Sequence, residues 1–147
     1  MPKQIINPAG LAAPRGFSHG ILVTGGRLLF LAGQDASDAE GRIVAPGDLV
    51  AQLDQVLRNL GAVVRAAGGQ IPDIAKLNIY VLDRDDYKAK LKPLGEVFRS
   101  HFGGYYPALA LFQVAALFNP DALIELEGYA VVGAETATES MDSIGSA

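Results

Sequence analysis

The chain has 147 residues, 50% of them hydrophobic, a formal net charge of −4 and no cysteine. This length predicts one domain with a hydrophobic core of its own. The lack of cysteine excludes a disulfide scaffold and a thiol nucleophile, and the acidic balance argues against a nucleic-acid partner. Because the only histidines are His19 and His101, we expect no metal site, and nothing in the sequence predicts a cofactor.

No apolar run reaches the ~18 residues of a membrane span, since Gly, Gln or Pro interrupts the longest ones. The N-terminal residues MPKQIINPAG lack the apolar stretch of a secretory signal. We therefore expect a cytoplasmic protein with no membrane partner.

The first part of the chain predicts three short strands. Residues 3–6 form a candidate edge strand that ends at Asn7 and Pro8. Residues 18–24 and 27–32 are also strand-like, and Gly25-Gly26 between them is a favoured two-residue hairpin connection. We expect these two strands to pair with each other.

Residues 49–67 are the clearest helix, because leucine and valine recur along one helical stripe. Asp48 is a suitable N-cap, and Gly68-Gly69 are a suitable stop. We expect the stripe to pack and the opposite side to be wet or to make polar contacts. That side carries Gln52, Gln55, Arg58 and Asn59.

A strand over residues 74–82 and a second helix follow. Asp83 with Asp86 three residues later resembles a capping arrangement for that helix. Pro93 falls inside the helical pattern and predicts a kink or a restart near Lys92. His101 lies near the end of the helix, where it can complement the helix dipole.

The last predicted strands are residues 108–116 and 122–132, which surround an Asn-Pro-Asp turn typical of a hairpin. Residues 108–116 are apolar on both faces of the strand. Two helices can cover only one side of a sheet, so the other apolar side needs a second cover. Other subunits are the cover we expect, which makes the protein an obligate oligomer.

The final strand carries two carboxylates among apolar residues. Its alternation places Glu125, Glu127 and Tyr129 on one face. One interpretation is that both carboxylates are solvated or ion-paired on an exposed sheet face. The other is that a carboxylate is held in a cleft for acid–base chemistry.

These elements predict an α+β fold with one mixed six-stranded sheet and two helices on one face. Residues 1–133 would form the single domain. Residues 134–147 contain few large apolar side chains, and we expect a disordered tail.

From about residue 5 to residue 132, the sequence resembles the YjgF/Rid family of reactive-intermediate (enamine/imine) deaminases, also labelled L-PSP endoribonucleases. The resemblance implies a chorismate-mutase-like homotrimer with clefts between neighbouring subunits, each taking a small-molecule ligand. The matching pieces occur in order along the chain: Leu31-Ala32-Gly33-Gln34, Gln52 with Leu57 and Asn59, Tyr106-Pro107-Ala108, and Ile124-Glu125-Leu126-Glu127.

The resemblance also implies which residues line the cleft. Glu125 is the implied catalytic residue, and Gly33 and Gln34 match the family pattern. The other implied substrate-binding positions are apolar in this chain: Leu109 in place of the carboxylate-binding arginine, Leu111 in place of a small polar or thiol residue, Leu91 in place of asparagine, Phe17 in place of tyrosine, and Phe118 in a loop about one residue longer than usual.

Family deaminases hydrolyse small imines that arise from amino-acid breakdown. Because Leu109 cannot bind a carboxylate, we expect an enamine or imine substrate that is less acidic than 2-imino acids, with Glu125 orienting or protonating water. Arg15 and His19 flank the entry loop and would replace the missing cation if they point inward. The other interpretation is that they are surface residues on a loop and a strand.

The alternative is a non-catalytic trimer that binds a small molecule or another protein, in which Glu125 only orders the cleft. A third activity, cleavage of RNA, is disfavoured by the acidic balance and by the lack of a histidine pair or a basic patch.

Overall fold

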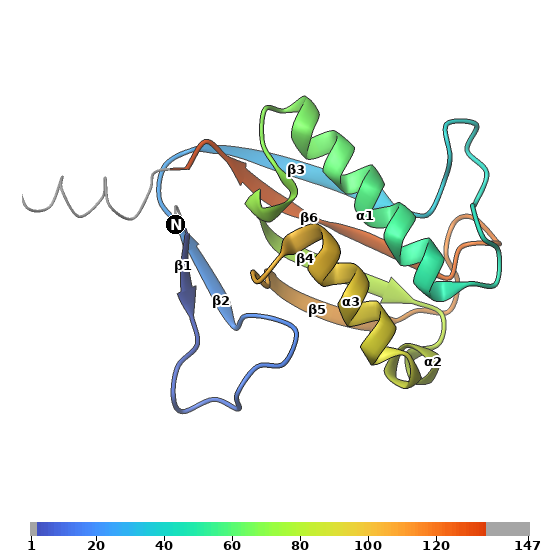
Figure 1. Ribbon diagram of the computed structural model, residues 1–147, viewed down its shortest axis with the longest axis horizontal. Coiled ribbons are helices and arrows are strands. Elements are labelled where there is room, and N and C mark those ends of the chain that lie inside the picture. Colours follow the sequence, from blue (N-terminus) through green and yellow to red (C-terminus); the bar gives the residue numbers. More distant parts are fainter. Residues whose placement is uncertain (1–2, 135–147) are drawn as a thin grey trace, which may run out of the picture.

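The computed structural model describes residues 3–134 (Figure 1). The predicted tail, residues 134–147, lies outside this range apart from Ala134. Strand β1 (Lys3–Ile6) pairs antiparallel with β2 (Gly20–Val23) in a small sheet of their own. The second sheet contains, in spatial order, β3 (Arg27–Gln34), β6 (Ile124–Val132), β4 (Ile74–Val81) and β5 (Ala108–Gln113).

The prediction of one six-stranded sheet is therefore wrong, and so is the hairpin between β2 and β3. Gly25 and Gly26 both adopt positive φ angles, of 73° and 82°, and carry the chain from one sheet into the other. The small sheet lies beside the β5 edge, where the Ser18 amide donates to the Pro107 carbonyl at 3.1 Å. A favoured turn sequence thus connects the two strands without pairing them.

The predicted hairpin between β5 and β6 is also wrong, because β4 lies between them. Strand β4 runs antiparallel to β6 and parallel to β5. With neighbours on both edges, β4 has partners for both rows of its backbone groups, which a buried strand requires.

Two helices cover one face of the larger sheet, as the sequence predicts. Helix α1 (Leu49–Ala66) and helix α3 (Leu91–Phe102) lie side by side on that face (Figure 1). A short helix α2 (Arg84–Ala89) precedes α3, and a 3₁₀ turn η1 (Ile71–Asp73) precedes β4. The restart predicted from Pro93 is confirmed, since α3 begins at Leu91 and Pro93 occupies its first turn.

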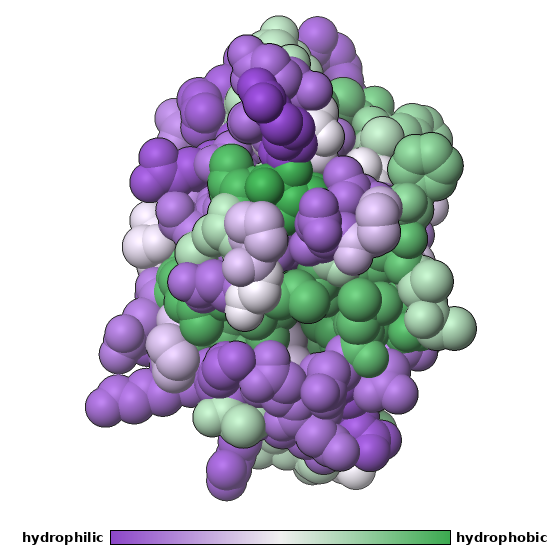
Figure 2. Space-filling view, turned by 90° about the vertical axis from the view of Figure 1, so that its right-hand side faces the viewer, coloured by the Kyte–Doolittle hydropathy of each residue, from purple (hydrophilic) through white to green (hydrophobic). Residues whose placement is uncertain are grey.

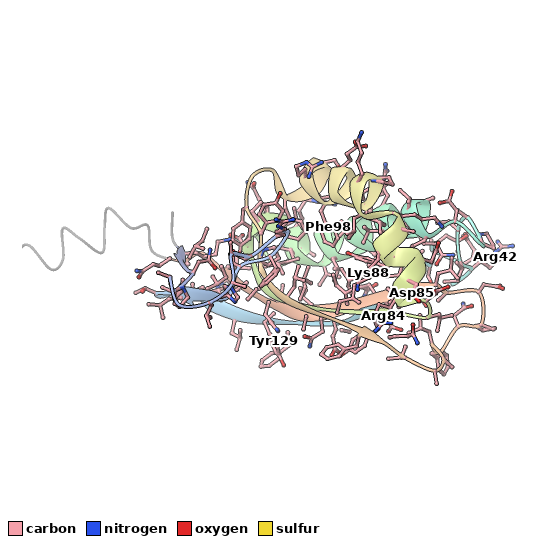
Figure 3. All side chains as sticks on the ribbon, turned by 90° about the horizontal axis from the view of Figure 1, so that it is seen from below. Arg42, Arg84, Asp85, Lys88, Phe98 and Tyr129 are labelled. Atoms are coloured by element: carbon pink, nitrogen blue, oxygen red, sulfur yellow. The ribbon has the colours of Figure 1, made fainter. Side chains whose placement is uncertain are left out.

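The hydrophobic core fills the layer between these helices and the sheet. Along most of β4 and β6 every second residue points into this core, and no helix among residues 3–134 covers the other side of these strands. Figure 3 shows both sides, with Phe98 of α3 on the helix side and Tyr129 of β6 on the opposite, uncovered side. Side chains with no exposed surface dominate the core: Leu53, Leu57, Leu60, Leu77, Ile79, Ile124 and Leu126.

His101 has a more specific role than the predicted dipole interaction. Its Nε2 lies 2.7 Å from Asp54 Oδ1, while Arg58 Nε donates to Asp54 Oδ2 at 2.9 Å. Burial alone would raise the pKa of Asp54, but the hydrogen bonds from His101 and Arg58 outweigh it and hold that pKa below its usual value. The group therefore ties α1 to α3.

Gln52 is fully buried, although it belongs to the polar side of α1. Its Nε2 donates to the carbonyls of Ala45 and Asp121, each at 3.2 Å, and its Oε1 accepts from the Leu123 amide at 2.8 Å. One side chain therefore fastens the loop before α1 and the start of β6 to the helix.

Among residues 3–134, no helix is both long and apolar enough to cross a bilayer.

Replacing Gln52 with leucine should lower the free energy of unfolding by about 3 kcal/mol, because three backbone groups lose the hydrogen bonds that this buried side chain makes to them. Gln55→Leu is the matched control, since Gln55 is half-buried and donates one hydrogen bond, to Asn59 Oδ1 at 2.9 Å. Urea denaturation of both variants measures the difference. Equal losses would contradict the fastening role of Gln52.

Candidate functional site

A cavity of about 340 Å³ lies between α3 and β5, on the helix side of the sheet. Strand β5 contributes Leu109 and Leu111, which pair with the helix-facing residues Leu77 and Ile79 of β4. The volume of the cavity lies at the lower end of the range for small-molecule sites.

Helices α2 and α3 supply the opposite wall of the cavity, with Tyr87, Leu91, Leu94 and Phe98. Burial raises the pKa of the Tyr87 phenol to about 12, so this group stays neutral. Figure 2 looks onto the end of the molecule where α2 and the start of α3 lie, and hydrophobic residues gather across its middle between hydrophilic borders. The cavity is thus largely apolar, as the substitutions at positions 91, 109 and 111 predict.

Two arginines also line this cavity. Arg15 comes from the loop between β1 and β2, next to Gly16, and Arg99 comes from the last turn of α3. The Arg99 side chain lies back along its helix, with Nη1 3.3 Å from the position that a Cβ would take at Gly95. Within residues 3–134, neither arginine forms an ion pair.

Of the two predicted replacements for the missing cation, Arg15 reaches the cavity and His19 does not. His19 Nε2 lies 2.7 Å from the Ala12 carbonyl, and its ring packs edge-on against Phe17 at 5.2 Å. Arg99 was missed in the sequence. Its signal was the helical spacing of four and eight residues from Gly95 and Leu91, which places it on the cavity face of α3.

Glu125 lies on the uncovered side of the sheet, away from this cavity. Its carboxylate packs against Gly33 of β3, where a Cβ would collide with it. Burial raises the pKa of Glu125, and the negative charges of Asp35 and Glu127 raise it further. The causes of this rise in pKa lie on the uncovered face and not among the cavity leucines.

The neighbours of Glu125 form a polar centre between aromatic pairs. Glu127 accepts a hydrogen bond of 2.5 Å from Tyr80 Oη. The aromatic pairs are Tyr80 stacked on Phe112 at 5.8 Å, and Phe30 edge-on to Tyr129 at 5.5 Å. Both carboxylates therefore lie half-buried on the sheet face that the described helices leave uncovered, and the acid–base interpretation of Glu125 stays a prediction.

The remaining predicted site residues lie apart from both places. Gln34 lines a polar groove beside Asn59 of α1, and Asn59 Nδ2 donates to the backbone carbonyls of Asp35 and Ser37. Phe118 is fully exposed in the loop between β5 and β6. One chain therefore brings together Leu91, Leu109 and Leu111 on one side of the sheet, and Gly33 and Glu125 on the other.

No group of three or more histidine, aspartate or glutamate side chains in residues 3–134 is placed to hold a metal ion. The cavity and the polar centre around Glu125 supply carboxylates, phenols and guanidinium groups.

Comparison with known proteins identifies the family. The Endoribonuclease L-PSP family matches residues 8–132. The structure resembles that of the Rid-family protein YyfB from Yersinia pestis, with a TM-score of 0.80 and 36% sequence identity over 90% of this chain and 100% of that one. The chain belongs to this family, also called YjgF/Rid.

Other solved structures agree with this assignment. RidA from Psychrobacter sp. PAMC 21119 is 32% identical over 82% of this chain and 92% of its own, with a TM-score of 0.63. A putative endoribonuclease from Thermotoga maritima is 29% identical over 78% of this chain and 85% of its own, with a TM-score of 0.62.

Replacing Glu125 with glutamine should change how stability depends on pH. Because the pKa of Glu125 is higher in the folded protein than in the unfolded chain, ionising this carboxyl lowers the free energy of unfolding. That loss of stability is absent below the unfolded pKa of about 4.3 and grows as pH rises through the folded pKa. The variant should therefore gain stability over the wild type as pH rises above about 4. Urea unfolding from pH 3.5 to 7 tests this, with exposed Glu96→Gln as the control. A constant difference across the range would contradict it.

Proposed function

We propose that this protein binds a small molecule in the cavity between α3 and β5 and hydrolyses an enamine or imine there. Glu125 from a second copy of the chain completes the site. Family membership supports the reaction class, and one observation carries the proposal. A carboxylate with a raised pKa is held against Gly33 on a sheet face that has no cover within the described chain.

A homotrimer is the assembly that this proposal requires. The uncovered face exposes large apolar side chains, with Phe30 at 69%, Leu28 at 58% and Phe112 at 48% of their surface. Such a patch on a folded protein favours association. Copies arranged around a threefold axis would cover this face and bring Glu125 of one copy towards the cavity of its neighbour.

Burial and the charges of Asp35 and Glu127 raise the pKa of Glu125, and we propose that this carboxyl moves one proton in both directions. In the proposed reaction it orients a water molecule and takes a proton from it as the oxygen adds to the imine carbon. It returns that proton to the nitrogen. The remaining hydroxyl proton then passes to the amine as the C=O bond forms, so the C–N bond breaks and ammonia leaves with a ketone or aldehyde as the second product.

The substrate we propose carries no carboxylate on its reacting carbon. Leu109 and Leu111 offer no donor on the β5 wall, so a carboxylate beside them would lose its hydration without a partner. A neutral carbon skeleton gains from the same contacts. Binding without turnover is the second candidate function, favoured by the separation of Glu125 from the cavity within one chain.

Placing a charge on the uncovered face should break the assembly. Phe30→Asp should convert a trimer into smaller species, because an aspartate would be buried without a partner. Val63→Asp, on the exposed side of α1, should leave the mass unchanged. Light scattering of both variants and the wild type measures this. A wild-type monomer in dilute solution would remove the intersubunit site.

Gly33→Ala should reduce hydrolysis while leaving stability nearly unchanged. The added methyl meets only the end of the Glu125 side chain, which can swing away at little cost but then no longer holds its position. We expect turnover of a small aryl ketimine, followed by ultraviolet absorbance, to fall about 100-fold, with the melting temperature within about 2 °C of the wild type.

Two further measurements complete this test. Glu125→Gln should show the same loss of turnover as Gly33→Ala. Leu109→Arg should raise turnover of 2-iminobutyrate by at least ~100-fold, about 2.7 kcal/mol, if it restores two charge-assisted hydrogen bonds. Equal activity of the wild type, Gly33→Ala and Glu125→Gln on the ketimine would leave binding without catalysis as the function.

A further inference from the structure

Two positive charges from separate parts of the chain face one apolar cavity. Arg15 lies in the loop before β2, and Arg99 lies 84 residues later in the last turn of α3. Among residues 3–134, no aspartate or glutamate lines the cavity. The cavity therefore offers positive charge that its own walls do not neutralise.

Arg99 is held in this position by the helix itself. Gly95, one turn earlier, leaves the space over which the guanidinium lies, with Nη1 3.3 Å from the position of an added Cβ. Any larger residue at position 95 would push the guanidinium outward. The absence of ion-pair partners for both arginines among residues 3–134 leaves their donors available.

The rest of the lining favours an apolar body. Leu94 is almost completely buried, Phe98 is half-buried and Leu91 is exposed, and all three line the cavity. Both arginines are exposed to solvent, so salt screens the attraction of each guanidinium for an anion, and contact with the apolar walls supplies the rest of the affinity. The guanidinium groups come from a helix and a loop, whereas Leu109 and Leu111 come from the sheet.

We propose that the ligand is an amphipathic monoanion, with a hydrocarbon body against the leucines and a distal carboxylate held between Arg15 and Arg99. This deepens the proposed function and rests on the same cavity. The anionic group is remote from the reacting carbon, which distinguishes this ligand from a 2-imino acid. A chain of about six to eight carbons suits the volume of about 340 Å³.

Calorimetric titration with butanoate, hexanoate and octanoate tests the proposal on the full-length protein. Affinity should rise about fourfold with each added methylene, the value for burying a CH₂ group. Octanamide, which has the same body and no charge, should bind at least tenfold more weakly than octanoate. Equal affinity for the acid and the amide would overturn the proposal.

Arginine variants locate the anion. Arg15→Gln and Arg99→Gln should each weaken octanoate binding about tenfold and leave octanamide binding within about twofold. Arg99→Lys should retain part of the affinity. Arg65→Gln is the matched control, because Arg65 lies back over Gly61 of α1 in the same way, with Nη1 2.9 Å from the Cβ position, but outside this cavity.

Two outcomes would reject the arginine pair. Unchanged octanoate affinity in both glutamine variants would show that the anion binds elsewhere. A fall in particle mass in these variants, measured by light scattering, would assign the arginines to subunit contacts.

The outcomes of the octanoate titration and of the ketimine assay can be told apart. Charge-dependent octanoate binding without ketimine turnover supports the ligand class and removes the reaction. Ketimine turnover with no octanoate binding supports the reaction and overturns the ligand class.

Discussion

The alternation of strand β6 is the constraint on which the rest of the structure depends. Its even-numbered residues lie beneath α1 and α3, so a carboxylate among them would be buried in the hydrocarbon core without a partner. Glu125 and Glu127 occupy odd positions and therefore face the side that none of the described helices covers. The cavity leucines of β5 face the other side. The sheet separates the candidate acid from the candidate pocket, and in our proposal a neighbouring copy unites them.

The local elements could be predicted from sequence because their signals are local. The apolar stripe and Asp48 cap predict α1, whose Asp48 side chain accepts from the Ala51 amide at 3.0 Å. Pro93 predicts the break before α3. Pairing between strands is different, because it depends on segments far apart in the chain. Gly25-Gly26 and the turn before β6 are typical of hairpins, yet the strands beside them pair elsewhere.

The residues of the candidate site also differ in how well the sequence indicates them. Leu91, Leu109 and Leu111, which the family resemblance assigns to one cleft, all line one cavity. It does not indicate Arg99, because the role of that side chain depends on the space left by Gly95. The pKa of Glu125 is raised partly by Asp35, which lies 90 positions earlier and whose nearness follows only from the pairing of β3 with β6. Residues that act through contacts across the sheet are the ones that sequence patterns miss.

Leucine at position 109, where the family resemblance implies arginine, affects the direction in which a ligand would lie as well as the charge of the cavity. An arginine on β5 would draw an anionic group towards the sheet, next to the reacting centre. Arg15 and Arg99 would instead draw it towards the helix and loop, and the hydrocarbon end would lie over Leu109 and Leu111. A ligand bound in this direction presents its uncharged end towards the strand edge that a neighbour's Glu125 would approach. Repulsion between two carboxylates is then avoided, because the anion lies at the far end of the ligand. In our proposal the cations lie on the loop and on α3 and not on β5, so the cavity still complements an anionic ligand, whose direction in the cavity is reversed.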